Sequence, residues 1–213
     1  MAEKGILFSG DMVRAILAGN KTVTRRPVTQ NKVDKFILNE HGRLLGSAES
    51  DYHGNYTEIY PTIDDAQYQP GDILYVRETW NHVHGQYSYR ADWEEGCLEG
   101  TRFARCVPVW RPSIHMPREA ARIFLRVTGV RVERLQEITE EGAAAEGFEP
   151  VGCDCSNRGA YGCTDCMNTG MLEPAMLGFV DTWNDIYTSR GYGWEQNPWV
   201  WVIEFERIEV DRG

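Results

Sequence analysis

Four of the six cysteines in this 213-residue chain lie close together in the sequence. Cys153, Cys155, Cys163 and Cys166 form the pattern C-x-C-x7-C-x2-C, in a stretch rich in glycine and asparagine that has no apolar periodicity. Two short pairs of thiolates match tetrahedral Zn²⁺, and because cysteine would fill every position, no place is left for a catalytic water. We therefore expect a structural zinc ion inside an insertion spanning residues 149–172. A loop of free thiols and a redox pair are the alternatives.

A second group of chemically capable side chains lies in the segment KTVTRR, from Lys21 to Arg26. It combines three cations, Lys21, Arg25 and Arg26, with two hydroxyls, those of Thr22 and Thr24. Such a segment can bind a polar or anionic ligand. On composition alone, however, a solvated basic stretch is the more common interpretation.

Three further polar residues are candidates for a binding site. Arg77 and Glu78 directly follow the apolar run 73–76, so we expect them either to close a pocket as a charged pair or to form an ordinary ion pair at its rim. His115 lies in the proline-rich sequence RPSIHMP, where a structural hydrogen bond is more typical than a role as a base.

Aromatic side chains offer flat faces on which any nucleobase can stack, although tryptophans are more often part of a core or a lid. Four tryptophans are candidates for such stacking: Trp80, Trp110, Trp194 and Trp199.

Charge and apolar runs exclude two classes of function. The chain has 22 Lys and Arg against 32 Asp and Glu, a net charge of −10, which is the wrong sign for a protein that grips duplex DNA by its phosphates. Apolar runs are far shorter than the roughly 20 residues of a membrane span, and the start has no basic region followed by an apolar one. We expect a cytoplasmic protein with a small ligand, and no duplex DNA or membrane partner.

Hydrophobic periodicity predicts an α+β fold of about six strands and three helices. One helix is expected at 11–19, with Ser9 or Asp11 as its N-cap and Gly19 at its end. A second runs from its cap Thr139 to Gly147, and a third from Pro174 to Gly191. Strands are expected at 73–76, around 87–89, at 123–135 with a bulge at Gly129, and at 199–210. Residues 27–67 read as loop, with a weak strand signal at 36–38.

The motifs AGNKTVTRR, PGDILYV, VTGVRVERL, TEEGAAAEG and WVIEF, in this order, resemble the ASCH domain of the PUA-like superfamily. The chain looks most like the longer ASCH-like proteins of bacteriophages and prophages, which also show sequences such as WRPSIHMP and GYGW. The resemblance implies a β-barrel and a single ASCH-like domain over residues 1–213. Residues 27–67, 79–122 and 149–172 would be insertions into its compact form.

The resemblance also implies roles for three residues. Many members of the superfamily bind RNA or modified nucleosides, and one small branch hydrolyses N4-acetylcytidine. Its G-x-K-x-x-T pattern matches Lys21 as proton acceptor and Thr24 as nucleophile, and the glutamate of its short helix matches Glu146 as proton donor. A lysine must lose its charge to act as a base, which burial or repulsion by Arg25 and Arg26 would promote. In a regular strand Lys21 and Thr24 would point to opposite faces, so we expect a turn or bulge between them.

The sequence therefore predicts a domain that binds a nucleoside, nucleotide or single-stranded RNA element and that can hydrolyse an N4-acylated cytidine. The expected pocket combines the three residues above with Arg25, Arg26, Arg77, Glu78 and His115. The alternative is a non-catalytic RNA-binding regulator whose zinc-stapled loop binds an unknown protein partner. A nuclease that uses the same basic segment is a third possibility, but the sequence has no carboxylate cluster typical of a metal-dependent one.

Overall fold

The computed structural model describes residues 2–34, 66–93, 109–149 and 174–210, together with the strand segments 36–38, 44–50, 56–59, 158–159 and 162–163. Its helices are α1 (Gly10–Ala18), α2 (Gln30–Val33), α3 (Glu140–Ala145) and α4 (Pro174–Tyr187). Its strands are β1 (Glu3–Leu7), β2 (Val23–Pro27), β3 (Phe36–Leu38), β4 (Leu44–Ser50), β5 (Tyr56–Ile59), β6 (Ile73–Arg77), β7 (Trp80–Val83), β8 (Gln86–Tyr89), β9 (Phe124–Arg134), β10 (Arg158–Gly159), β11 (Gly162–Cys163) and β12 (Trp199–Ile208).

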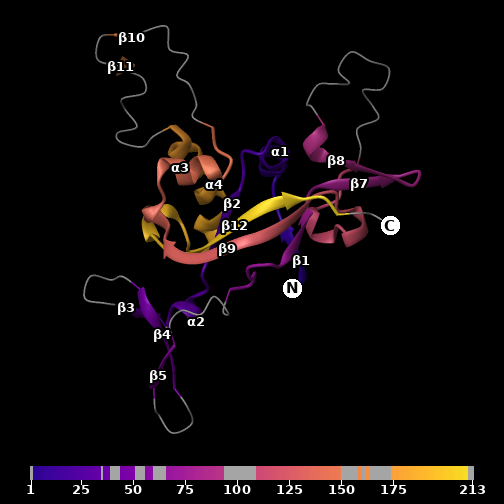
Figure 1. Ribbon diagram of the computed structural model, residues 1–213. Helices are drawn as coiled ribbons and strands as arrows, with labels where there is room; N and C mark the ends of the chain where they lie inside the picture. The colour runs from indigo at the N-terminus through magenta and orange to yellow at the C-terminus, as the bar shows by residue number, and fades with distance from the viewer. Residues whose placement is uncertain are drawn as a thin grey trace.

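The central sheet has five strands in the order β1-β6-β9-β12-β2. β1 is parallel to β6, and the other neighbours are antiparallel. The long strands β9 and β12 cross the middle of the molecule, with α3 and α4 beside one end of them (Figure 1). In their pairing Glu204 lies opposite Gly129 and Phe205 opposite Val127, so Thr128 is an extra residue. This is the bulge expected at Gly129. The mixed α+β class is confirmed.

The described strands do not form the closed barrel that the resemblance implied. In the part of the chain that the structure describes, the edge strands β1 and β2 each pair with one neighbour only. Side chains bridge the gap between these edges. Arg26 Nη2 in β2 donates to Leu7 O in β1 at 3.0 Å, and the Tyr68 hydroxyl donates to Gly5 O at 3.1 Å. These bonds occupy edge carbonyls that would otherwise be open to pairing with another chain.

The two faces of the sheet bury different cores. Side chains alternate between the faces of a strand, so in β12 Trp201 and Ile203 pack with α1, whereas Val200 and Val202 pack with α3 and α4. A third cluster packs around Trp80. The strand β2 therefore lies between the two larger cores, and its alternate residues enter one or the other.

The caps predicted for α1 and α3 are present. The Ser9 hydroxyl accepts from Met12 N at 3.4 Å, and Gly19 ends α1 with φ 83°. The Thr139 hydroxyl accepts from Gly142 N at 3.1 Å. These caps define the ends of α1, which precedes Lys21, and the start of α3, which ends next to Glu146.

Several expectations about residues 27–67 and the first strands were wrong. β1 and β2 were not expected as strands. Residues 27–67 were expected to be loop apart from a weak strand signal at 36–38, which coincides with β3, and they also contain α2, β4 and β5. The strand expected at 123–135 is confirmed as the single long strand β9, which pairs with β12 and β6.

Three of the four cysteines predicted to hold zinc lie outside the described residues: Cys153, Cys155 and Cys166. Of the fourth, Cys163, only the backbone is described, in β11. No helix among the described residues is long and apolar enough to cross a membrane.

Candidate functional site

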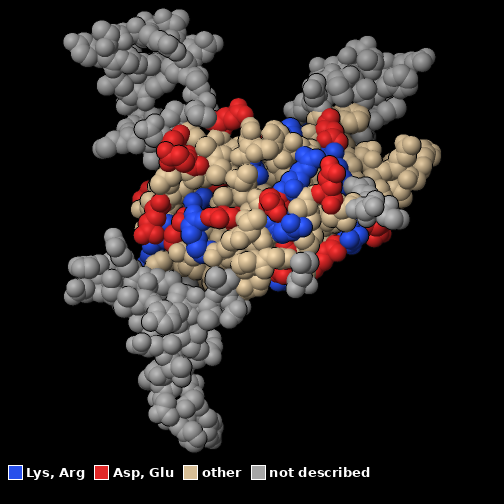
Figure 2. Space-filling view, viewed as in Figure 1, with Lys and Arg blue, Asp and Glu red and all other residues tan. Residues whose placement is uncertain are grey.

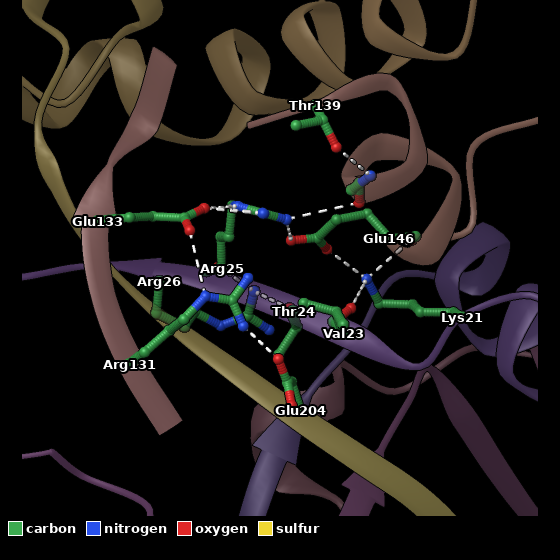
Figure 3. A network of polar contacts seen from close by, with 11 residues as sticks. Lys21, Val23, Thr24, Arg25, Arg26, Arg131, Glu133, Thr139, Glu146 and Glu204 are labelled. Carbon is green, nitrogen blue, oxygen red and sulfur yellow. Dashed lines mark hydrogen bonds and ion pairs between the residues drawn. The ribbon is translucent and has the colours of Figure 1, made fainter. Parts of the chain in front are cut away.

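Lys21 is held at the junction of α1, β2 and the end of α3. Its backbone N–H donates to Ala15 O at 3.1 Å, and it forms an isolated antiparallel bridge with Glu146. Its Nζ lies 2.9 Å from Val23 O, 2.8 Å from Glu146 O and 2.5 Å from Glu146 Oε2 (Figure 3). An ammonium has three N–H groups, so each has an acceptor.

Arg25 continues this network on the face of β2 that packs with α3 and α4. Its Nε donates to Glu133 Oε1 at 2.9 Å and its Nη1 to Glu146 Oε1 at 3.3 Å (Figure 3). Both Arg25 and Glu146 are buried. Glu146 thus receives Lys21 on one oxygen and Arg25 on the other, which offsets the cost of burying its charge.

Thr24 and Arg26 lie on the opposite face of β2 from Arg25. Arg26 pairs across the sheet with Trp201, whose ring belongs to the core under α1. Arg26 Nη1 donates to Thr24 Oγ1 at 2.9 Å, and Thr24 is completely buried. In the described part of the chain, the hydrogen bond of the Thr24 hydroxyl is therefore with Arg26 rather than with Lys21. No bulge within β2 is needed, because the strand begins at Val23, after Lys21.

Burial lowers the pKa of Lys21, and Glu146 opposes this by favouring the charged amine. Arg26 and Arg25 add to the lowering, so both causes expected from the sequence act, with burial the larger. Carbonyls can only accept, so Nζ must donate to Val23 O and Glu146 O in either charge state. A neutral amine has two N–H groups, so it still makes both bonds.

A small hollow lies beside this network, between β2 and α4. We call it the α4 hollow. Its lining combines polar groups of the network, aromatic side chains of α4 and a few neighbouring side chains. The lining residues are Met12, Arg25, Arg26, Glu146, Phe148, Phe179, Thr182, Trp183, Ile186 and Tyr187. Its volume is about 20 Å³. That is room for about one water molecule and far less than the roughly 300 Å³ of a typical ligand pocket.

Arg77 and Glu78 do not pair with each other. Arg77 Nε donates to Met116 O at 3.1 Å and its Nη2 to Ile114 O. Glu78 is buried and receives both Nε and Nη2 of Arg122, at 2.8 and 3.1 Å. Arg77 ends β6, and Glu78 follows it directly. Because successive side chains of an extended segment point to opposite sides, these two side chains lie apart. Burial raises the pKa of Glu78, and Arg122 opposes this.

His115 and the four candidate tryptophans also lie apart from the α4 hollow. His115 is exposed in a short 3-10 helix, Ser113–His115. The lining of the α4 hollow includes none of the four candidate tryptophans, which are Trp80, Trp110, Trp194 and Trp199. Trp80 and Trp199 are buried beneath the guanidinium groups of Arg111 and Arg134, with 5.2 and 4.4 Å to the ring centroids.

The structure adds residues that the sequence analysis did not place at the site. Glu133 binds Arg25, and Trp183 of α4 lines the α4 hollow. The alternation of β9 places Glu133 and Arg131 on one face, and Arg131 Nε lies 3.3 Å from Glu133 Oε2. A carboxylate within a predicted strand was the available signal for Glu133. No signal in the sequence distinguished Trp183 from an ordinary core residue.

Among the described side chains, no group of three or more His, Cys, Asp or Glu is placed to hold a metal ion. The charged side chains on the face seen in Figure 2 are of both signs and interleaved rather than gathered into one basic patch. The arrangement at Lys21 and Glu146 is thus a local cluster of charges in an acidic protein.

The chain matches no protein-family model and no curated protein. Among solved structures it is similar to the crystal structure of an ASCH domain from Lactobacillus crispatus JV V101, with a TM-score of 0.37 and 11% sequence identity over 97% of this chain and 79% of that chain. A likeness this distant carries no activity or site residue over to this chain.

Proposed function

We propose that this chain binds a nucleoside, nucleotide or single-stranded RNA element at the α4 hollow. The observation that supports this is the buried pair of Arg25 and Glu146 at the edge of that hollow. A carboxylate accepts from an exocyclic amino group, and a guanidinium donates to a ring carbonyl or ring nitrogen. Cytosine, adenine and guanine each present an exocyclic amino group beside a ring nitrogen, so the pair complements their polar edges.

Glu146 keeps hydrogen-bonding capacity for a ligand, and Arg25 keeps one of its five N–H groups beyond its contacts with Glu133, Gly142 O and Glu146. A carboxylate has about four lone-pair sites, and the protein contacts described above give Glu146 one cation on each oxygen. The protein therefore holds the two groups in position while leaving capacity for a base.

Aromatic residues on α4 suit the flat part of the same ligand. Phe179, Trp183 and Tyr187 recur every four residues, so they lie on one face of the helix, and all three line the α4 hollow. Stacking on aromatic rings contributes about 1–3 kcal/mol per base in proteins that bind single strands.

The charge of the site suits an anionic ligand. Three cations, those of Lys21, Arg25 and Arg26, are near two carboxylates, those of Glu133 and Glu146. Arg26 is half-buried and contributes to the lining of the hollow, and we propose that its guanidinium contacts the phosphate of the ligand. This local excess of positive charge lies in a chain of net charge −10, which favours a small or short ligand over a long polyanion.

Because the hollow is small in this structure, ligand entry requires that it widen. Met12, Thr182 and Ile186 line it and are half-buried, so these side chains can move without opening the core. A ligand that binds only the widened state pays for that change in affinity. We therefore expect micromolar rather than nanomolar binding.

The proposal is tested by calorimetry and thermal shift with the four nucleoside 5′-monophosphates. A monophosphate that binds should raise the unfolding temperature, because it binds the native state. Arg26→Gln should weaken that binding about tenfold or more, since it removes a charged hydrogen bond to the phosphate. Arg126→Gln is the matched control, because Arg126 lies on the surface of β9 with Glu206 as its partner and should leave binding unchanged. Absence of binding by every monophosphate and by short single-stranded RNA would refute the proposal.

Hydrolysis of an N4-acylated cytidine is the second candidate function. It is favoured by the lowered pKa of Lys21 and by its contact with Glu146, which together form a route for a proton. Thr24, the candidate nucleophile, would have to exchange its hydrogen bond with Arg26 for contact with the substrate. Binding without turnover would instead support the non-catalytic regulator.

A further inference from the structure

A second hollow lies beside the edge strand β2 and residues 66–68. Its lining includes Trp201 and Ile203 of β12, Tyr68 and Arg26. Thr29 and Lys32, which follow β2, are also part of its lining. We call it the edge hollow. Its volume is about 100 Å³. An apolar cavity of about 150 Å³ takes up benzene, so this hollow is close in size to one flat ring.

The edge hollow combines aromatic rings with cations. The Tyr68 ring is buried and anchored by its hydroxyl bond to Gly5 O. The Lys32 ammonium lies 6.0 Å from the centroid of the Trp201 ring, and Arg26 pairs with Trp201 across the sheet. Rings with nearby cations are the combination that holds the base and the backbone phosphate of a single strand.

Arg26 connects this hollow with the α4 hollow, because it lines both. Its guanidinium has five N–H groups. Contacts with Thr24 Oγ1, Arg25 O and Leu7 O, at 2.9 to 3.0 Å, fix its position and use three of them. Burial raises the pKa of Tyr68, and Arg26 opposes this rise.

We propose that the edge hollow is a subsite for the nucleotide next to the one bound in the α4 hollow, with Arg26 on the phosphate between them. The ligand class is then a short single-stranded oligonucleotide rather than a free nucleoside. The base of the second nucleotide lies against Tyr68 and Trp201, and Lys32 contacts its phosphate. This inference rests on the proposed function, because it assigns the neighbour of that ligand.

The test compares nucleoside 5′-monophosphates with the matching single-stranded RNA tetranucleotides rA4, rC4 and rU4. We expect a tetranucleotide to bind at least about tenfold tighter than its monophosphate, since a second base stacks and a second phosphate is paired. Lys32→Gln should remove most of this advantage and leave monophosphate affinity unchanged. It should also reduce the slope of log K against log salt by about 0.7, the value for one phosphate contact in a single strand.

Arg126→Gln again serves as the control and should alter neither affinity nor salt slope. Equal affinity for monophosphate and tetranucleotide would overturn the subsite and leave the proposed function intact. A tetranucleotide advantage that persists in Lys32→Gln with an unchanged salt slope would also overturn it, because the second nucleotide would then lie elsewhere. If neither ligand class binds, both proposals fail together. Circular dichroism and the unfolding temperature of Lys32→Gln establish that the variant is folded.

Discussion

Lys21 and Glu146 are 125 residues apart in the chain, and Lys21 Nζ lies 2.5 Å from Glu146 Oε2 with both side chains buried. This contact ties the end of α1 to the end of α3, and Thr22 N adds a backbone bond to Ala145 O at 2.9 Å. A buried ion pair costs desolvation energy, so its presence alone does not show that it stabilises the fold. Replacing each partner alone and then both together separates the energy of the ion pair from the cost of burying its charges.

We predict that Lys21→Met and Glu146→Leu will each lower the free energy of unfolding by about 3–5 kcal/mol, because each leaves a buried charge without its main partner. The double variant should be destabilised by much less than the sum. Urea unfolding of the four proteins gives the coupling energy, which we expect to exceed about 1 kcal/mol. The exposed pair of Arg126 and Glu206, 3.2 Å apart, is the control and should show near-additive effects. Additivity at Lys21 and Glu146 would mean that their contact is not formed in solution.

Gly147 positions Glu146 against Lys21, and its replacement should be unusually costly. Gly147 has φ 91°, and a Cβ there would lie 2.6 Å from Ala15 Cβ and 3.0 Å from Lys21 Cβ. Gly191 has φ 81° with no atom within 4 Å of the same position. Gly191→Ala should therefore lose only the roughly 1–2 kcal/mol of the left-handed backbone. Gly147→Ala should lose about 1–3 kcal/mol more through overpacking, as measured by urea unfolding. Equal losses would contradict the close approach of α1 to Gly147.

Asp72 should support stability above mildly acidic pH. Burial alone would raise the pKa of Asp72, but hydrogen bonds from Lys4 Nζ and from the N–H groups of Ala2 and Gln69 bring it below its ordinary value. A carboxyl with a lowered pKa contributes stability above its unfolded pKa, and this contribution is lost as the pH falls through the folded pKa. Stability should thus fall between about pH 5 and pH 3.

The measurement for Asp72 is urea unfolding from pH 7 to pH 3. Asp72→Asn should be less stable than the wild type at pH 7, and the difference between them should shrink as the pH falls. Asp11→Asn, at an exposed carboxylate next to Arg14, is the control and should follow the wild-type pH profile. A constant difference between Asp72→Asn and the wild type would show that the charge of Asp72 is not responsible.

Local signals in the sequence predicted the helices around the site, and non-local contacts explain what it missed. Ser9, Gly19 and Thr139 favour caps within their own segments, so α1 and α3 could be found. The strand β2 reads VTRRP, which suggests a solvated loop. It is a strand because Glu133 and Glu146 compensate the charge of Arg25 and because β12 supplies its hydrogen bonds.

The site residues show the same difference between local signals and non-local contacts. The structure brings Lys21 and Glu146 into contact, and their roles as proton acceptor and proton donor stay a prediction. The pairing of Arg77 with Glu78 was wrong, and the partner of Glu78 is Arg122, 44 residues away. Spacing within a segment could not reveal a partner on a different element. For the same reason Trp183 and Trp201, and not the tryptophans singled out, line the two hollows.

We predict that about one zinc ion per chain co-purifies with reduced protein, held by Cys153, Cys155, Cys163 and Cys166. Cys155→Ser should lose the metal, because three thiolates hold zinc less tightly than four. Cys106→Ser is the matched control and should keep it. Since the pattern predicts an insertion outside the sheet, the unfolding transition of the sheet should survive in Cys155→Ser. Elemental analysis that finds no zinc in fresh, reduced wild-type protein would remove this prediction.

Turnover of N4-acetylcytidine tests the roles of Lys21 as base and Thr24 as nucleophile. If Lys21 takes the proton of Thr24, then Lys21→Ala and Thr24→Ala should each abolish release of cytidine, and the double variant should be scarcely worse than either, because the two residues act as a unit. Glu146→Gln should slow departure of the leaving amine, since an amide cannot donate its proton to it. Thr24→Ser keeps the hydroxyl and should retain turnover.

Binding separates this reaction from a purely structural role of Thr24. Its hydroxyl accepts from Arg26, so Thr24→Ala should cost about 1–3 kcal/mol of stability whether or not the protein is an enzyme. Ligand affinity of folded Thr24→Ala should stay within about threefold of the wild type, because the hydroxyl acts in the chemical step. Chromatography of cytidine released from N4-acetylcytidine and related N4-acylated nucleosides measures turnover. Wild-type protein that binds these nucleosides and releases no cytidine would refute the hydrolase and favour the RNA-binding regulator.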